Sequence, residues 1–336
     1  MIKNTFIIMT CNKGQSILFR NFVCNARAKN LDLSRIVMFA TDEYTMKLSK
    51  ELNINVYYDA ALFGDMPEQS AKQYGDRTFS KMMMAKVYCV HLVMSLGYNI
   101  LYQDVDIIWN TNPLSYLITT SSPDELTSDT KENKQPKWDM MFQDDGSRQS
   151  RFAPYSPNSG FYFVRNTQIT KYFFNILLRR IDMIFVSKSH QAVLNDLLTE
   201  FSSWKGLKIK IFHNGYNNLF MGGSEYHNNI GLMKDIYITG KESKPYIHHM
   251  SWTENKDNKK LFFEQLGEWY TVEDTSHNTT TDTTTNTTTT NSIGNNGNGN
   301  GYCLLQPNIT CHYRDKPSII PCTNNPPIVK NGVSFW

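Results

Sequence analysis

Residues Asn99–Trp109 read NILYQDVDIIW, an apolar segment interrupted by two acids, and no other segment constrains the architecture as strongly. Its first residues, Asn99–Tyr102, favour a short strand that runs directly into Asp104. The preceding Ser80–Leu96 favours a helix that ends at Gly97, a residue type common just after a helix C-terminus. A helix followed by a buried strand is the repeating unit of parallel sheets. The segment therefore predicts an α/β protein with two acids at the carboxyl end of a strand.

The rest of the N-terminal half repeats this alternation. Strands are predicted at Phe6–Met9, Ile36–Ala40 and Asn55–Tyr58, and a helix is predicted from about Gly14 to Lys29. Such crossover units build a mostly parallel sheet flanked by helices, and open sheets of this class bind ligands beyond the carboxyl ends of their strands. The two acids of the central segment are therefore placed where chemistry is expected.

Asp104 and Asp106 are two residues apart in an extended segment, so their side chains project to the same side. Converging carboxylates suit a hard divalent ion, Mn²⁺ or Mg²⁺, which keeps positions open for the oxygens of a diphosphate. Acids that merely cap a turn are the commoner meaning of an isolated Asp-x-Asp. Here the apolar Ile107–Trp109 places them in the interior, where an unpaired charge is costly.

A phosphatase of the haloacid-dehalogenase class is a minor alternative, because it also carries Asp-x-Asp after a strand and uses the first Asp as nucleophile. That class has Thr or Val at the position of Ile108 and usually places the motif near the start of the domain. Two or three strands precede the motif here, which favours the metal site.

The composition argues against two classes of partner. The 336 residues contain 34 Lys and Arg against 31 Asp and Glu, so a net charge of +3 gives no reason to expect nucleic acid or an anionic membrane. The apolar start, Met1–Met9, is much shorter than a signal-peptide core or a membrane span. We therefore expect a cytoplasmic protein with no membrane partner.

The cysteines show no CxxC pair, and in a cytoplasmic protein we expect free thiols that mostly fill the core: Cys11, Cys24, Cys89, Cys303, Cys311 and Cys322. A small C-terminal disulfide or metal knot is the alternative. Residues 275–301 are almost entirely Thr, Asn, Gly and Ser, which predicts a disordered linker after a domain spanning 1–274. Residues 302–336 are too few for a core, so they are either a tail that packs back or the start of a second domain.

Several motifs together resemble one enzyme family. Lys86, Gly97-Tyr98, the segment Tyr102–Trp109 and Asn112-Pro113 resemble the nucleotide-diphospho-sugar transferases of glycosyltransferase family 77, and are similar to the glycogenin-type family 8 enzymes. The resemblance covers roughly Met1–Thr271. It implies the GT-A fold, a Rossmann-like and mostly parallel sheet flanked by helices. It also implies transfer of a sugar from a UDP-sugar with retention of anomeric configuration.

The resemblance also implies the ligands of the ion and of the donor sugar. His249, in a His-x-x-Trp element, would be the third ligand of the ion beside the two acids, as a neutral imidazole. Asn158, Ser159 and Gly160 match a segment that contacts the donor sugar.

Further donor contacts follow from the same likeness. Lys86 and Lys256 would supply positive charge for donor phosphates or sugar hydroxyls, and Thr10 and Asn12 would bind the uracil or ribose. Lys256 lies in the charged run 254–260, which is ordinarily a solvated face.

One position departs from the family pattern. His190 stands where the family commonly has an acid, and Gln191 follows it. A neutral Gln is a poor covalent nucleophile, so we expect a front-face substitution in which the leaving phosphate oxygen takes the acceptor proton. Asp144 and Asp145 are candidate positioning or basic groups near the acceptor, or simply a solvated turn before Gly146.

The resemblance extends to a donor and an acceptor. The cytoplasmic form of the family that carries a Thr/Asn-rich linker transfers α-galactose to a glycan on a ubiquitin-ligase adaptor and continues into a β-propeller. By this likeness we expect UDP-galactose as donor, a protein-bound glycan as acceptor, and 302–336 as the start of a propeller-like domain. A donor-site relic that binds a UDP-sugar and a partner protein without turnover is the alternative.

Overall fold

The computed structural model describes residues 4–72, 74–121, 137–150, 156–212, 219–237, 239–253, 255–272 and 301–309 of the chain. The helices are α1 (Ser16–Ala28), α2 (Glu43–Glu51), α3 (Ala60–Phe63), α4 (Arg77–Ser95), α5 (Leu114–Ser121), α6 (Gln168–Arg179), α7 (Met183–Ser187), α8 (His190–Trp204), α9 (Gly223–Asn228), α10 (Ile230–Tyr237) and α11 (Lys256–Gln265), with a 3₁₀ turn η2 (Lys13–Gln15). The strands are β1 (Thr5–Cys11), β2 (Ile36–Ala40), β3 (Asn55–Tyr57), β4 (Asn99–Gln103), β5 (Ile107–Trp109), β6 (Met140–Asp144), β7 (Pro157–Val164), β8 (Ile209–Phe212), β9 (Phe220–Met221), β10 (Ile247–His249), β11 (Trp269–Thr271) and β12 (Cys303–Asn308).

A seven-stranded sheet in the order β3-β2-β1-β4-β7-β6-β8 forms the centre of the fold. Its strands pair in parallel except at β7, which runs antiparallel to both β4 and β6. The mostly parallel sheet flanked by helices that the sequence predicts for a GT-A domain is confirmed. Each of the strands predicted from the first hundred residues is present, and Ile36–Ala40 matches β2 at both ends.

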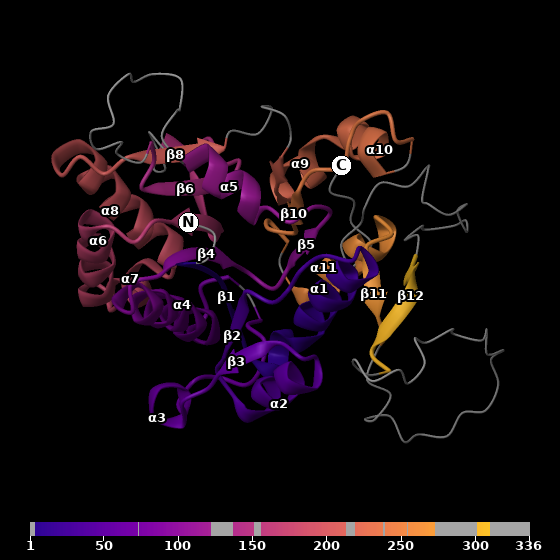
Figure 1. Cartoon of the computed structure of the whole chain (residues 1–336), viewed down its shortest axis with the longest axis horizontal. Helices are drawn as coiled ribbons and strands as arrows, with labels where there is room; N and C mark the ends of the chain where they lie inside the picture. Colours follow the sequence, from indigo (N-terminus) through magenta and orange to yellow (C-terminus); the bar gives the residue numbers. More distant parts are fainter. Residues whose placement is uncertain are drawn as a thin grey trace.

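Strand β4 is buried on both faces, which explains why its sequence is apolar without a break. Leu101 belongs to the core cluster that contains Phe22 of α1, whereas Ile100 and Tyr102 belong to the cluster that contains Val90 of α4. Successive side chains of a strand point to opposite faces, so one apolar segment fills both cores. Figure 1 shows the resulting division, with α6, α7 and α8 at one end of the molecule and α1, α11, β11 and β12 at the other.

A second sheet, β5-β10-β9, continues from the carboxyl end of β4. Strand β5 begins three residues after Asp104 and pairs antiparallel with β10, so that Ile107 lies opposite His249. The Asp-Val-Asp step is therefore the turn between the two sheets. Among the residues that the structure describes, no helix has both the length and the apolar character needed to cross a membrane.

A disulfide joins Cys24 of α1 to Cys303 of β12, with 5.2 Å between the Cα atoms. The prediction of free thiols is therefore wrong for these two cysteines, whereas Cys11 and Cys89 are free and buried. Strand β12 also pairs antiparallel with β11, so residues 303–308 pack on the main domain. Cys311, Cys322 and nearly all of the predicted linker lie outside the described residues.

Removal of the disulfide is expected to destabilise the protein. In a Cys24→Ala/Cys303→Ala variant the free energy of unfolding should fall by about 2–4 kcal/mol, because the bond closes a very long loop and restricts the unfolded chain. Urea denaturation followed by circular dichroism measures this difference. Reduced wild-type protein should behave like the double variant, and equal stability of oxidised wild type and double variant would contradict the link.

Candidate active site

The two acids are fixed by backbone hydrogen bonds from both sides. The Asp104 amide donates to the carbonyl of Gly160 on β7 at 2.7 Å, and the Met250 amide donates to the carbonyl of Asp106 at 2.9 Å. The first bond extends the pairing of β4 with β7 past the carboxyl end of β4 in the main sheet, and the second lies beside the small sheet. The step between the strands is thus held at the junction of both sheets, with its side chains directed by rigid elements.

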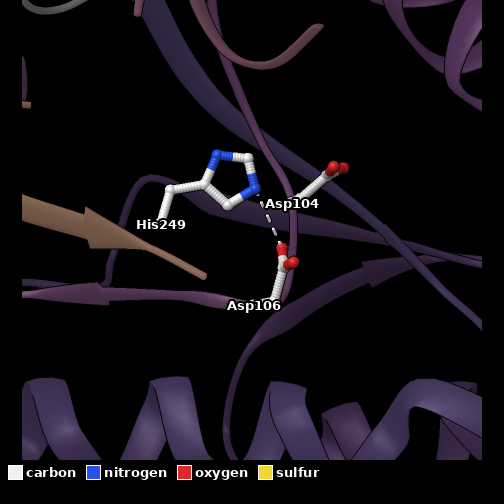
Figure 2. Close-up of side chains that lie close together, drawn as sticks. All are labelled: Asp104, Asp106 and His249. Carbon is white, nitrogen blue, oxygen red and sulfur yellow. Dashed lines mark ion pairs between the residues drawn. The ribbon is translucent and has the colours of Figure 1, made fainter. Parts of the chain in front are cut away.

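Asp104, Asp106 and His249 form one cluster, in which one ligand atom from each residue lies within 4.8 Å of the others. Asp106 and His249 are buried, and Asp104 is partly exposed. Figure 2 shows the imidazole of His249 directed at Asp106, with 3.3 Å between Nε2 and Oδ1, and Asp104 beside them. The structure therefore brings together the three residues that the sequence predicts as metal ligands.

The orientation of the His249 ring follows from its neighbour Gln143. The Gln143 amide donates to the carbonyl oxygens of Phe220 and Met221 at 3.2 and 2.7 Å, which turns its own oxygen toward the imidazole. Nδ1 of His249 lies 2.8 Å from that oxygen and must be the protonated nitrogen. Nε2 consequently faces Asp106 with a free lone pair, as a metal ligand requires.

Gly160 leaves the space that the cluster needs. A Cβ atom at this position would lie 2.5 Å from Oδ2 of Asp104, 2.6 Å from Cε1 of His249 and 3.0 Å from Oδ1 of Asn158. A side chain at this position would force these neighbouring side chains to shift. Two carboxylates and one imidazole around an open position also match the preferences of Mn²⁺ and Mg²⁺ for hard oxygen and borderline nitrogen donors. The residues present therefore fit a divalent ion.

Two lysines are paired with the two acids. Nζ of Lys86 lies 2.6 Å from Oδ1 of Asp104, and Nζ of Lys259 lies 2.5 Å from Oδ2 of Asp106. Burial raises the pKa of Asp106, but the charge of Lys259 and its hydrogen bond to the carboxylate lower it further, so the pKa lies below its ordinary value. Asp106 is therefore an anion at neutral pH, ready to bind a cation.

Lys259 is a site residue that the sequence prediction missed. It belongs to the charged run 254–260, which is ordinarily a solvated face. The structure places both lysines on α11, three positions apart, and both line the same cavity. Residues three apart lie on one face of a helix, so the spacing from Lys256 was the signal that could have identified Lys259.

A cavity of about 520 Å³ opens over the cluster, a size typical of small-molecule sites. All but one of the predicted site residues line it: Thr10, Asn12, Lys86, Asp104, Asp106, Asn158, Ser159, Gly160, His190, Gln191, His249 and Lys256. The amide nitrogen of Asn12 is already engaged, because it donates to the carbonyls of Pro67 and Gln69 at 2.7 and 3.0 Å. Asn12 thus fixes one wall of the cavity.

Asp144 is the predicted residue that does not line the cavity. Its carboxylate is bound by Arg148, at 2.7 and 3.0 Å. The adjacent Asp145 lines the cavity instead and accepts hydrogen bonds from Asn158 at 2.7 Å and from Trp252 at 3.3 Å. Burial raises the pKa of Asp145 above its ordinary value.

Gln191 and His190 are the first residues of α8, which Ser189 caps by accepting a hydrogen bond from the Ala192 amide at 3.1 Å. Oε1 of Gln191 accepts a hydrogen bond from the Ser159 amide at 3.0 Å. The helix start is thereby attached to β7 beside Gly160. Both predicted residues line the cavity.

Buried histidines give the protein a predictable loss of stability in weak acid. Burial, and for His190 also the charge of Lys86, lowers the pKa of His190 to about 3, and burial lowers the pKa of His227 to about 4. In the unfolded chain a histidine titrates near pH ~6.5. Below that pH the unfolded state binds protons that the folded state does not, so stability falls as the pH drops from about 6.5 toward 4.

The melting temperature measured across this range checks the prediction. The free energy of unfolding of the wild type should fall by up to about 1.4 kcal/mol per pH unit for each such histidine, and the melting temperature should fall with it. His227→Gln should reduce this dependence on pH by the contribution of one histidine. An unchanged melting temperature between these limits would show that the rings are protonated in the folded state.

Comparison with known proteins gives one family. Residues 31–263 match the model of the nucleotide-diphospho-sugar transferase family. The UDP-galactose:fucoside alpha-3-galactosyltransferase of Dictyostelium discoideum is 24% identical over 305 residues, which cover 81% of this chain and 44% of that protein. The beta-arabinofuranosyltransferase RAY1 of Arabidopsis thaliana is 24% identical over 166 residues, or 49% of this chain and 28% of that protein. The chain thus spans less than half the length of these curated relatives.

Among solved structures, the galactosyltransferase LgtC in complex with donor and acceptor sugar analogs is 13% identical. The match covers 80% of this chain and 97% of that one, with a TM-score of 0.46. At this identity and TM-score, the similarity to that structure does not bear on the function of this chain.

Proposed function

Because the chain belongs to the nucleotide-diphospho-sugar transferase family and is therefore a glycosyltransferase, we propose that it uses a UDP-sugar with Mn²⁺ or Mg²⁺ held by Asp104, Asp106 and His249. The observation that carries the proposal is the cluster of these three residues, two of them buried, with Gly160 leaving space beside them. Membership of this family leaves no support for the phosphatase alternative.

The ion, when bound, neutralises the charge that develops on the departing nucleoside diphosphate, which is the main barrier to breaking a sugar-phosphate bond. The protein's own residues supply the remaining positive charge. Lys86 and Lys259 hold the two carboxylates in place, and Lys256 lines the cavity from the same helix face as Lys259. We assign Lys256 to the donor phosphates.

The sugar would lie between β7 and the start of α8. Asn158 and Ser159 come from β7, and Gln191 is hydrogen-bonded to the Ser159 amide. Gln191 is neutral and already accepts this hydrogen bond, so it orients rather than attacks. We therefore propose transfer with retention by a front-face route, in which the leaving phosphate oxygen takes the proton of the acceptor hydroxyl. Asp145, held by Asn158 and Trp252, would position the acceptor.

The donor sugar and the acceptor are the finer part of the proposal. The Dictyostelium relative is described as transferring galactose from UDP-galactose to a fucoside, which supports UDP-galactose as donor and a fucose-containing glycan as acceptor. The Arabidopsis relative, an arabinofuranosyltransferase, makes a pentose donor the main competitor. A glycan on a ubiquitin-ligase adaptor stays a prediction.

A cytoplasmic location also stays a prediction. The disulfide between Cys24 and Cys303 weighs against it, because disulfides persist mainly in oxidising compartments.

A panel of UDP-sugars tests the proposal. Purified protein with Mn²⁺ should release UDP from one of them, slowly with water as acceptor and faster with a fucoside, and EDTA should stop the release. UDP binding by calorimetry without UDP release from any donor would instead support the non-catalytic alternative. Release that persists in EDTA would contradict the metal site.

A further inference from the structure

Strand β8 is an edge strand of the main sheet. It is the last strand in the order and pairs in parallel with β6, and in the part of the chain that the structure describes no strand pairs with its other side. An edge strand presents a row of backbone N–H and C=O groups with which a further extended chain can pair. All four residues of Ile209–Phe212 are only half-buried. The strand is therefore open to one more strand.

Positive charge gathers at this edge. Lys208 directly precedes β8, Lys210 lies within it, and Lys205 follows the end of α8. None of these three lysines has a carboxylate partner among the described residues. Burial lowers the pKa of Lys210, and the charge of Lys137 lowers it further, so these two ammonium groups lie close enough to repel each other. An anionic partner would relieve this repulsion.

An exposed tryptophan adjoins the same edge. Trp204, the last residue of α8, is 83% exposed, the highest value among the exposed large hydrophobic residues of the described chain. It lies four residues before Lys208. Tryptophan is enriched at the centres of protein interfaces, where it contributes much of the binding energy. The basic edge thus has an apolar contact beside it.

The chemistry of this surface selects its partner. A second copy of the chain that paired through the same strand would bring two sets of lysines together, and like charges on neighbouring strands repel. Lys208 and Lys210 are two residues apart in an extended segment, so they project to the same side. An added strand with an acid at every second position would place its carboxylates on one face in the same way. An acidic extended polypeptide therefore fits both the charge and the spacing.

We propose that β8, its three lysines and Trp204 form a docking edge for an acidic polypeptide segment, which adds to the main sheet as a further strand. None of the residues of the docking edge lines the cavity, so the partner would leave the cavity open. The inference is independent of the proposed transferase activity.

Binding of a fluorescein-labelled dodecapeptide of alternating Glu and Val, followed by anisotropy, tests the proposal. Wild type should bind the peptide, less tightly as salt is added, and Lys208→Glu/Lys210→Glu should bind it at least about tenfold more weakly. Trp204→Ser should also weaken binding about tenfold. The matched control is Lys47→Glu/Lys50→Glu, which changes the net charge equally on exposed positions of α2, beside β3 at the opposite edge of the sheet. It should bind as wild type does.

A second peptide tests strand addition with the wild-type protein alone, so it decides the question even if a variant fails to fold. A dodecapeptide of alternating Glu and Pro keeps the charge but lacks half of the N–H donors, and it should bind at least about tenfold more weakly. The Glu-Val peptide should also slow amide hydrogen exchange in residues 208–212, measured by mass spectrometry.

Three results would overturn the proposal. The first is equal binding of the two peptides, the second is unchanged exchange in residues 208–212, and the third is full affinity in the folded charge-reversal variant. Lysine-dependent binding to phosphatidylserine vesicles without binding of the Glu-Val peptide would assign the surface to a membrane and overturn the proposal as well.

Discussion

Replacement of Asp106 by asparagine is expected to lower kcat/KM for UDP release by about a thousandfold or more. The variant keeps the volume of the side chain but removes the charge that both the ion and Lys259 require. The ion site would then contain only one carboxylate and one imidazole. The ammonium group of Lys259, no longer paired with a carboxylate, would repel the metal ion. Turnover of the best donor in Mn²⁺, compared between the two proteins, measures the effect.

The matched control for this variant is Asp65→Asn, which removes a carboxylate from an exposed position outside the cavity. It should leave kcat/KM unchanged. Calorimetry should also show weaker Mn²⁺ binding in Asp106→Asn and unaltered binding in the control. If Asp106→Asn keeps more than about a tenth of the wild-type activity, Asp106 is not a ligand of the ion that the reaction uses.

Addition of a single methyl group at Gly160 is expected to have the second largest effect. A Cβ atom there meets Asp104, His249 and Asn158 at 3.0 Å or less, and two of these are proposed ligands of the ion. Gly160→Ala should therefore displace the ligands and lower kcat/KM by at least about a hundredfold, since a displacement of roughly 1 Å at a reacting centre has costs of this size. Mn²⁺ affinity should fall in parallel.

Gly231→Ala is the control, because a Cβ atom at Gly231 in α10 meets only Asn229, at 3.9 Å. This substitution should leave activity unchanged and stabilise the helix by up to about 1 kcal/mol. Thermal melting measures the stability of each variant, so that a change in activity can be distinguished from a loss of folding. Wild-type activity in a folded Gly160→Ala protein would show that the space beside the acids is not needed.

The central part of the fold and of the site could be predicted from the sequence because it depends on local patterns. An apolar strand that ends in Asp-x-Asp is visible in eleven residues, and the helix before it ends at a glycine. The strand order was not visible, nor was the antiparallel pairing of β5 with β10 that brings His249 opposite the step. That ligand was assigned only through the resemblance to a family.

Two departures have specific physical causes. The choice between Asp144 and Asp145 depends on which of two adjacent residues faces the cavity, and the ladder between β6 and β7 is irregular between Phe142 and Asp144. An irregularity changes the alternation of side chains, so strand periodicity could not select the acid. The disulfide joins cysteines 279 residues apart, and no spacing rule predicts such a pair.

The central claim is that His249 and the two acids hold the ion on which sugar transfer depends. Pulsed electron paramagnetic resonance of Mn²⁺ bound with UDP tests it most directly, because a coordinated imidazole nitrogen modulates the spin echo. We predict a nitrogen coupling in the wild type that disappears in His249→Ala, and loss of the bound Mn²⁺ signal in Asp106→Asn. Bound Mn²⁺ without a nitrogen coupling, or a coupling that survives in His249→Ala, would contradict the account.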